Sequence, residues 1–120
     1  MKVRCTKLID VEGKSQVSSS WLTVGKIYQV LSIVLDVHGS WLFRLMGDSS
    51  PGLGLFPKEQ FEIVSAKIPG SWVPTWSENG VFELTPEVWT KVGFWERYFE
   101  HDDEAIRQFN LEVEKLVADV

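Results

Sequence analysis

The chain has 120 residues, of which 44% are hydrophobic and 24% are charged, and its formal net charge at pH 7 is −5. This composition is typical of one globular domain, or of a small domain with an appendage, and it excludes a disordered or fibrous chain. No apolar run approaches the roughly 18 residues that a membrane span needs, and the N-terminal segment lacks the apolar core of a signal peptide. A single cysteine, Cys5, suits a reducing compartment. We therefore expect a cytoplasmic protein without membrane contact, in which Cys5 is buried and inert.

The charge is distributed unevenly. Residues 1–76 hold eight Lys or Arg against six Asp or Glu, whereas residues 77–120 hold four against eleven. The first part has a balance of +2 and the second a balance of −7. An acidic second part argues against nucleic acid as its partner. It favours a basic protein partner, unless these residues only form a solvated helix face.

Short strands separated by turns are predicted for residues 1–66. The periodicity of two and the β-branched and aromatic residues indicate strands, and the glycine- and serine-rich segments between them indicate turns. Trp41, Phe43 and Leu45 share one face of their strand. Five short strands without helical periodicity favour a small barrel. The expected strands cover residues 2–6, 27–35, 41–46, 53–56 and 61–64, and a polar loop covers 10–20.

Residues 67–80 are predicted to be a connector that packs on the barrel. Its two prolines exclude a helix. Trp72 and Trp76 would point the same way in an extended segment, and burying both against the barrel would be favourable. Residues 81–84 are one more candidate strand.

The C-terminal segment, residues 81–120, is predicted to be helical. Thr85, Pro86 and Glu87 form a typical helix start. A further turn is expected over 94–99, and Asp102 or Asp103 is expected to cap a final helix over about 104–118. That helix has one apolar stripe, with Glu112 and the other charged residues mostly outside it. The stripe consists of Ile106, Phe109, Val113, Leu116 and Val117.

Because the stripe needs a covering surface, we expect the helical segment to pack on the barrel as one cooperative unit. The six tryptophans are expected mainly in packing, with one or two partly exposed as recognition anchors.

No residue set for catalysis or metal binding stands out. His38 and His101 are the only histidines and Cys5 is the only cysteine, which argues against a zinc site. The carboxylates near residue 102 are explained by helix capping. We therefore expect no enzyme activity and no cofactor.

The first part resembles an SH3 domain. Residues 22–31 match the end of that family's long loop and its second strand, and Trp41 falls where the third strand begins with tryptophan. Residues 54–62 are similar to the family's Gly-Leu-Phe-Pro segment, which leads through one 3₁₀ turn to an aromatic residue and the last strand. The resemblance covers about residues 2–65. It implies an α+β protein with an SH3-like five-stranded β-barrel of the bacterial and phage type, followed by the helical segment.

The SH3 resemblance also implies candidate binding residues. Trp41, Pro57 and Phe61 match three positions of the family's groove for proline-rich peptides. The tyrosine-rich motif of the family's first strand is replaced here at residues 3–7, and the long loop is poor in acid. The sequence looks more like the bacterial and phage barrels, which serve as a general scaffold.

The second part, from Thr85 to Ala105, resembles short bacterial immunity proteins in size, acidity and aromatic content. Those proteins neutralise a toxin by binding it. The preferred function is therefore a non-enzymatic protein-binding module, and an immunity protein that covers a basic toxin domain is one form of it. Glu100, Asp102 and Glu104 are the candidate contacts. The alternative is an adaptor that binds proline-rich peptides, and nucleic-acid binding through the barrel is less favoured.

Overall fold

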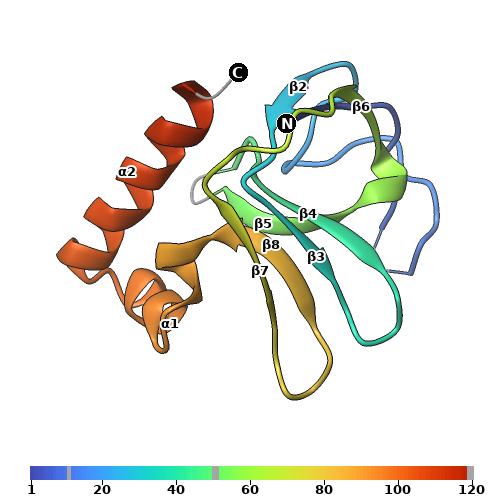
Figure 1. The fold of residues 1–120 in the computed structure, drawn as a ribbon. Coiled ribbons are helices and arrows are strands. Elements are labelled where there is room, and N and C mark those ends of the chain that lie inside the picture. The colour runs from blue at the N-terminus through green and yellow to red at the C-terminus, as the bar shows by residue number, and fades with distance from the viewer. Residues whose placement is uncertain (11, 50–51, 119–120) are drawn as a thin grey trace.

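The structure is a computed structural model that describes residues 1–10, 12–49 and 52–118. It confirms the α+β class, with the two α-helices on one side of the strands (Figure 1). The strands are β1 (Lys2–Cys5), β2 (Ile27–Gln29), β3 (Ser32–Leu35), β4 (Trp41–Met46), β5 (Leu53–Pro57), β6 (Phe61–Ser65), β7 (Trp72–Trp76) and β8 (Phe82–Pro86). The helices are the short 3₁₀ helices η1 (Lys58–Gln60) and η2 (Glu87–Thr90), and the α-helices α1 (Phe94–Phe99) and α2 (Asp103–Ala118).

The strands form two antiparallel sheets and not a single closed barrel. The first sheet has the order β2-β1-β6, and the second has the order β5-β4-β3-β8-β7. The long strand predicted over residues 27–35 is divided between the two sheets, as β2 and β3. The Val30 N–H donates to the carbonyl of Met1, whereas the Leu31 N–H donates to the carbonyl of Arg44. The chain therefore exchanges one set of strand partners for the other at this point.

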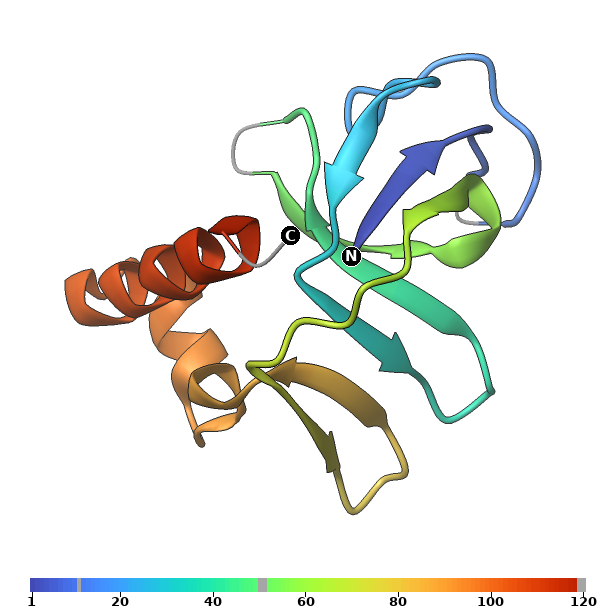
Figure 2. The ribbon, with the colours of Figure 1, turned by 45° about the horizontal axis from the view of Figure 1, so that its top comes forward.

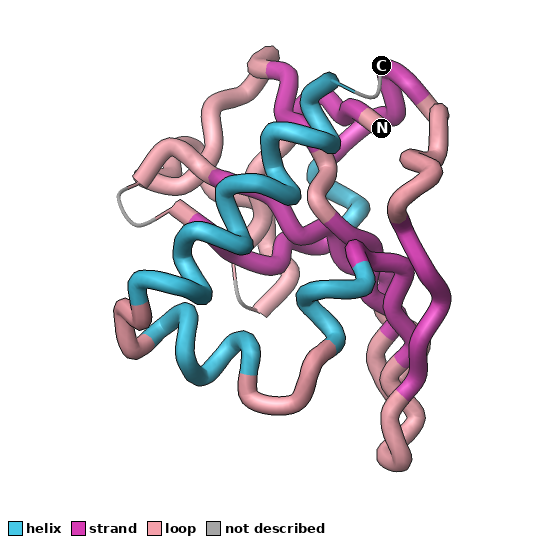
Figure 3. The backbone as a smooth tube through the Cα atoms, turned by 60° about the vertical axis from the view of Figure 1, so that its left-hand side comes forward, coloured by secondary structure: helices cyan, strands magenta, loops and turns pink. Residues whose placement is uncertain are grey.

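The predicted connector contains a strand. Residues 72–76 form β7, which pairs with β8, and β8 pairs with β3, so that this hairpin extends the second sheet. The β3–β4 and β7–β8 hairpins project side by side from the rest of the fold (Figures 2 and 3). Trp72 is buried at the base of its hairpin, as expected, but the expected burial of Trp76 is wrong, because this residue lies near the hairpin tip and is 72% exposed.

The outer edge of β7 carries a proline. The Ser77 N–H donates to the carbonyl of Val81, which fixes the alternation of bonded and non-bonded pairs in this hairpin. In that alternation Pro74 and its partner Leu84 are a non-bonded pair, so the proline nitrogen faces away from β8. Because proline has no N–H, this edge lacks a donor where another strand would need one.

The predicted helix start at Thr85 is wrong. Thr85 and Pro86 are the last residues of β8, where Thr85 pairs with Val73, and Pro86 has extended backbone angles of φ −55° and ψ 136°. Pairing with the neighbouring strand therefore outweighs the local helix-start signal, and η2 begins only at Glu87. The cap of the final helix is confirmed, since the Asp102 carboxylate accepts hydrogen bonds from the N–H groups of Glu104 and Ala105.

The strands and helices share one hydrophobic core. Phe43 and Leu45 from β4 and Phe94 from α1 are fully buried within it. Cys5 is also fully buried, and this burial raises the pKa of its thiol. Helix α2 contributes Ala105, Phe109 and Leu116.

The predicted apolar stripe needs two corrections. Glu112 lies on the buried face of α2, whereas Val117 is exposed. Glu112 follows Phe109 by three residues and precedes Leu116 by four, which places all three on one side of the helix. Lys115 extends to the Glu112 carboxylate at 3.2 Å.

Candidate functional site

The structure separates the three candidate residues of the barrel. Trp41 and Phe61 are both half-buried and line a hollow of about 310 Å³, where the Lys58 ammonium lies 5.7 Å from the centre of the Trp41 ring. Pro57 lines a different hollow, beside Trp21. The reason is local, because η1 lies between the end of β5 at Pro57 and the start of β6 at Phe61.

The three candidate carboxylates gather at the junction of α1 and α2. Glu100 ends α1, and its N–H donates to the carbonyl of Glu96. Asp102 is occupied as the cap of α2. Glu104 accepts hydrogen bonds of 2.5 and 2.9 Å from Arg107, which lower the pKa of the Glu104 carboxyl. Asp102 and Glu104 therefore already have structural roles.

Three further hollows lie next to one another along β5. They share lining residues, and we call their union the aromatic groove. The loop hollow, of about 490 Å³, is lined by residues that include Ile9, Trp21, Leu55, Phe56 and Pro57. The helix hollow, of about 360 Å³, is lined by Trp21, Leu53, Tyr98, Phe99, His101 and Ile106. The Arg44 hollow, of about 400 Å³, is lined by Arg44, Leu53, Gly54, Leu55, Trp95 and Phe99.

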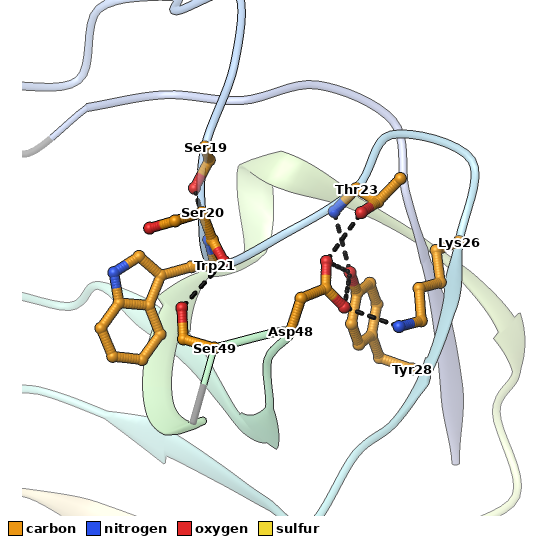
Figure 4. A network of polar contacts seen from close by, with 8 residues as sticks. All are labelled: Ser19, Ser20, Trp21, Thr23, Lys26, Tyr28, Asp48 and Ser49. Carbon is orange, nitrogen blue, oxygen red and sulfur yellow. Dashed lines mark hydrogen bonds and ion pairs between the residues drawn. The ribbon is translucent and has the colours of Figure 1, made fainter. Parts of the chain in front are cut away.

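Trp21 stands where the loop hollow meets the helix hollow. Its side chain is 42% exposed, and its ring lies 6.1 Å from that of Phe56. Its backbone is held on both sides. Its N–H donates to the Ser19 hydroxyl at 3.0 Å (Figure 4), and its carbonyl accepts from the Asp48 N–H at 2.7 Å. The Ser49 hydroxyl donates to the carbonyl of Ser20 at 2.8 Å. An exposed indole is thus presented from an anchored backbone.

Asp48 connects this anchor to the first sheet. Its carboxylate accepts a hydrogen bond of 2.7 Å from the Thr23 hydroxyl and pairs with the Lys26 ammonium at 2.6 Å (Figure 4). The Tyr28 hydroxyl lies 3.0 and 3.1 Å from the two carboxylate oxygens. The hydrogen bond from Lys26 is the main reason that the pKa of the Asp48 carboxyl is below its ordinary value. This network ties the loop of Trp21 to β2 and to the turn after β4.

Arg44 forms the polar floor of the hollow named after it. Its guanidinium lies 4.6 Å from the centre of the Trp95 ring, donates to the Ser32 hydroxyl at 2.9 Å and pairs with Glu83. This cation–π contact fixes Trp95 of α1 over the second sheet. Phe99, one turn further along α1, is 62% exposed at the mouth of the hollow.

Sequence reasoning missed the aromatic groove because its walls come from distant parts of the chain. Trp21 follows a polar loop, and Phe99 ends a single short helix. Neither position has a periodicity that separates a binding residue from a packing residue. The only available signal was the number of tryptophans, which predicted an exposed anchor without saying which one.

The described residues contain no group of three or more His, Cys, Asp and Glu side chains that could hold a metal ion. None of the helices in the described ranges is long and apolar enough to cross a membrane. Comparisons with protein-family models, with curated proteins and with solved structures found no match for the chain.

Proposed function

We propose that this protein is a non-enzymatic protein-binding module whose aromatic groove docks a basic partner protein. The observation that carries the proposal is the exposed indole of Trp21 on its anchored backbone, at the meeting point of two apolar hollows. Tryptophans in such positions dominate the binding energy of protein interfaces. A backbone that is already fixed also loses little conformational entropy when a partner binds.

The charge around the groove indicates the kind of partner. Phe99 and Ile106 line the helix hollow, and the segment between them contains four carboxylates and one exposed histidine. Asp10 lines the loop hollow at the other end. A basic partner would be attracted by this rim, and the attraction would speed its association.

A toxin-neutralising immunity protein is one form of this function. An aromatic and acidic surface that docks on the basic active-site face of a toxin would block access to that face. The acidic balance of residues 77–120 supports this form. The partner is then a basic toxin domain, and neither a cofactor nor a membrane takes part.

The SH3-like relationship of residues 1–66 belongs to the same proposal. Two features support it: β1 lies between β2 and β6, and the single 3₁₀ turn η1 joins β5 to β6. In this interpretation the β7–β8 hairpin and the helical segment are additions to an SH3-like unit, and the aromatic groove forms where the additions meet it.

The second candidate function is an adaptor for proline-rich peptides. The hollow lined by Trp41 and Phe61 favours it, because aromatic-lined grooves bind such peptides. Neither Trp72 nor α2 is among the residues that line this hollow. Pro57, however, lies in the loop hollow, so the three implied groove residues do not form one site.

A displayed library of random twelve-residue peptides tests the proposal. We expect selection on the wild-type protein to enrich peptides that combine Lys or Arg with large apolar residues. Binding of these peptides should weaken at least about tenfold in Trp21→Ala, because an interface anchor contributes about 2 kcal/mol or more. Trp76→Ala is the matched control, since Trp76 is even more exposed but lies outside the groove. It should bind the peptides as the wild type does.

The contrary outcomes are also specific. Enriched peptides that bind Trp21→Ala as well as the wild type contradict the proposal. Proline-rich peptides that lose binding in Trp41→Ala support the adaptor instead. A further check is the association rate, which should fall as salt shortens the Debye length from about 10 Å at 0.1 M to about 3 Å at 1 M.

A further inference from the structure

Strand β5 is a free edge of the second sheet and forms a wall of the aromatic groove. Among the described strands it pairs with β4 alone, and it contributes Leu53, Gly54 and Leu55 to the Arg44 hollow. The edge is therefore not covered by another strand, although it lies among the side chains that make the groove apolar.

The hydrogen-bond pattern shows which backbone groups of β5 face outward. The Gly47 N–H donates to the carbonyl of Gly52 at 2.7 Å, and this bonded pair fixes the alternation along the β4–β5 ladder. Phe56 is then in a bonded pair with β4, whereas Leu53 and Leu55 are in non-bonded pairs. The N–H and C=O groups of Leu53 and Leu55 consequently point away from β4.

These outward groups have no partner within the described part of the chain. Leu53 and Leu55 make no bond in the ladder with β4, and no other hydrogen bond to their N–H or C=O groups occurs among the described residues. Backbone polar groups beside apolar surface are unfavourable unless they are paired or hydrated. The groove therefore holds a row of backbone donors and acceptors with the spacing of a β-strand.

The hollows match the alternation of an added strand. Leu53, Leu55 and Arg44 share one face of the sheet, toward the Arg44 hollow. Phe56 is on the opposite face and contacts Trp21 in the loop hollow. Successive side chains of a strand paired with Leu53 and Leu55 would enter these two hollows in turn.

We infer that the aromatic groove binds an extended segment of a basic partner protein by strand addition to β5. This inference rests on the proposed function and specifies its mode. The N–H and C=O of Leu55 pair with one residue of the segment, and those of Leu53 pair with a residue two positions away. Apolar side chains of the segment enter the hollows, and its Lys or Arg side chains reach the carboxylates between Phe99 and Ile106. Main-chain bonds then supply affinity, and the two hollows supply specificity.

The test uses a synthetic eight-residue peptide with blocked termini, in which four consecutive valines are flanked by two lysines at each end, so that valines face both hollows. Leu55→Pro is the decisive variant, because it removes an outward N–H without removing a bond of the β4–β5 ladder. Leu55→Ala is its matched control, which shortens the side chain and keeps the N–H. Titration calorimetry measures the affinity, and amide hydrogen exchange reports on Leu53 and Leu55. Thermal melting shows whether each variant is folded.

We expect the peptide to slow amide exchange at both leucines in the wild type. Its affinity should fall about tenfold or more in Leu55→Pro beyond any loss in Leu55→Ala, since a lost and unreplaced backbone hydrogen bond has an effect of this order. A second peptide carries N-methylated valines and therefore lacks the N–H donors that would pair with β5. Its affinity for the wild-type protein should be as low as that of the unmodified peptide for Leu55→Pro, or lower. If Leu55→Pro does not fold, the N-methylated peptide on the wild-type protein decides the question alone.

Three results would overturn the inference. Binding that depends on Trp21 but leaves the exchange of both amides unchanged would refute strand addition and leave the proposed function standing. Absence of any binding by this peptide would refute a basic strand as the occupant, while the library selection still tests the groove. A wild-type dimer that becomes monomeric in Leu55→Pro would show that a second copy of this chain occupies the edge.

Discussion

The rings of Trp89 and Phe109 are stacked, with centroids 5.1 Å apart and an interplanar angle of 17°. Trp89 belongs to η2 and Phe109 to α2, so this contact joins the final helix to the segment that follows the second sheet. Tyr98 of α1 adds a third ring 4.6 Å from Phe109. The helices are thus held together mainly by aromatic packing.

Removal of the Phe109 ring should strongly destabilise the protein. Phe109 is 3% exposed, and truncation of a buried phenylalanine to alanine costs about 3–5 kcal/mol. Denaturant unfolding should show this loss for Phe109→Ala. Leu111→Ala, on the exposed side of the same helix, should change the free energy of unfolding by less than about 0.5 kcal/mol. Similar, small effects of both substitutions would mean that α2 is not docked.

Alanine substitutions of Glu112 and Glu114 should differ in their effect on stability, although both residues are glutamates of α2. Glu112 lies on the buried face, whereas Glu114 is exposed. Glu112→Ala leaves a gap beside the core and deprives Lys115 of its partner, and a typical cost of such a change is about 1 kcal/mol. Glu114→Ala should alter stability little. Equal unfolding midpoints for the two variants would contradict this placement.

Stability at acid pH should depend on Asp48. Its folded-state pKa is below its ordinary value, so its contribution is fully present above the unfolded-state pKa of about 3.9. That contribution is lost as pH falls through the lower, folded-state value. Melting temperatures measured between pH 6 and pH 2 should therefore decline less in Asp48→Asn than in the wild type. An equally steep decline in both would show that Asp48 does not contribute to the loss of stability at acid pH.

Replacement of Thr85 by valine should stabilise the protein. The Thr85 hydroxyl is buried and has no hydrogen-bond partner within the described residues. A buried polar group without a partner costs about 1–3 kcal/mol, and valine has nearly the same shape. We expect Thr85→Val to raise the free energy of unfolding by about 1 kcal/mol, and Thr85→Ala to lower it. A loss of stability in Thr85→Val would show that the hydroxyl is satisfied in solution.

The sequence predicted the elements whose signals are local. Alternation located β4, and the acidic residues before the final helix located the cap at Asp102. It did not predict the break between β2 and β3, because that break depends on the bonds from Val30 to Met1 and from Leu31 to Arg44. These bonding partners are distant in sequence, so no periodicity in the sequence around residues 30 and 31 indicates them.

Two errors have a different origin. At Thr85 a valid local helix signal was overridden by strand pairing with Val73. At Glu112 the helical spacing from Phe109 already indicated the buried face, but its charge suggested the exposed one. The candidate site was even harder to predict from the sequence. Trp21 and Phe99 are far apart in the chain, and folding brings them to one hollow.

The two edges of the second sheet differ in how well they could pair with a strand of another molecule. Pro74 interrupts the outward donors in the middle of β7, whereas the outward-facing Pro57 is the last residue of β5 and leaves the donors and acceptors of Leu53 and Leu55 uninterrupted. A sheet with two receptive ends could propagate from molecule to molecule into a filament. A proline in the middle of the β7 edge disfavours such propagation, because β7 of one molecule would lack a central donor for the β5 edge of the next.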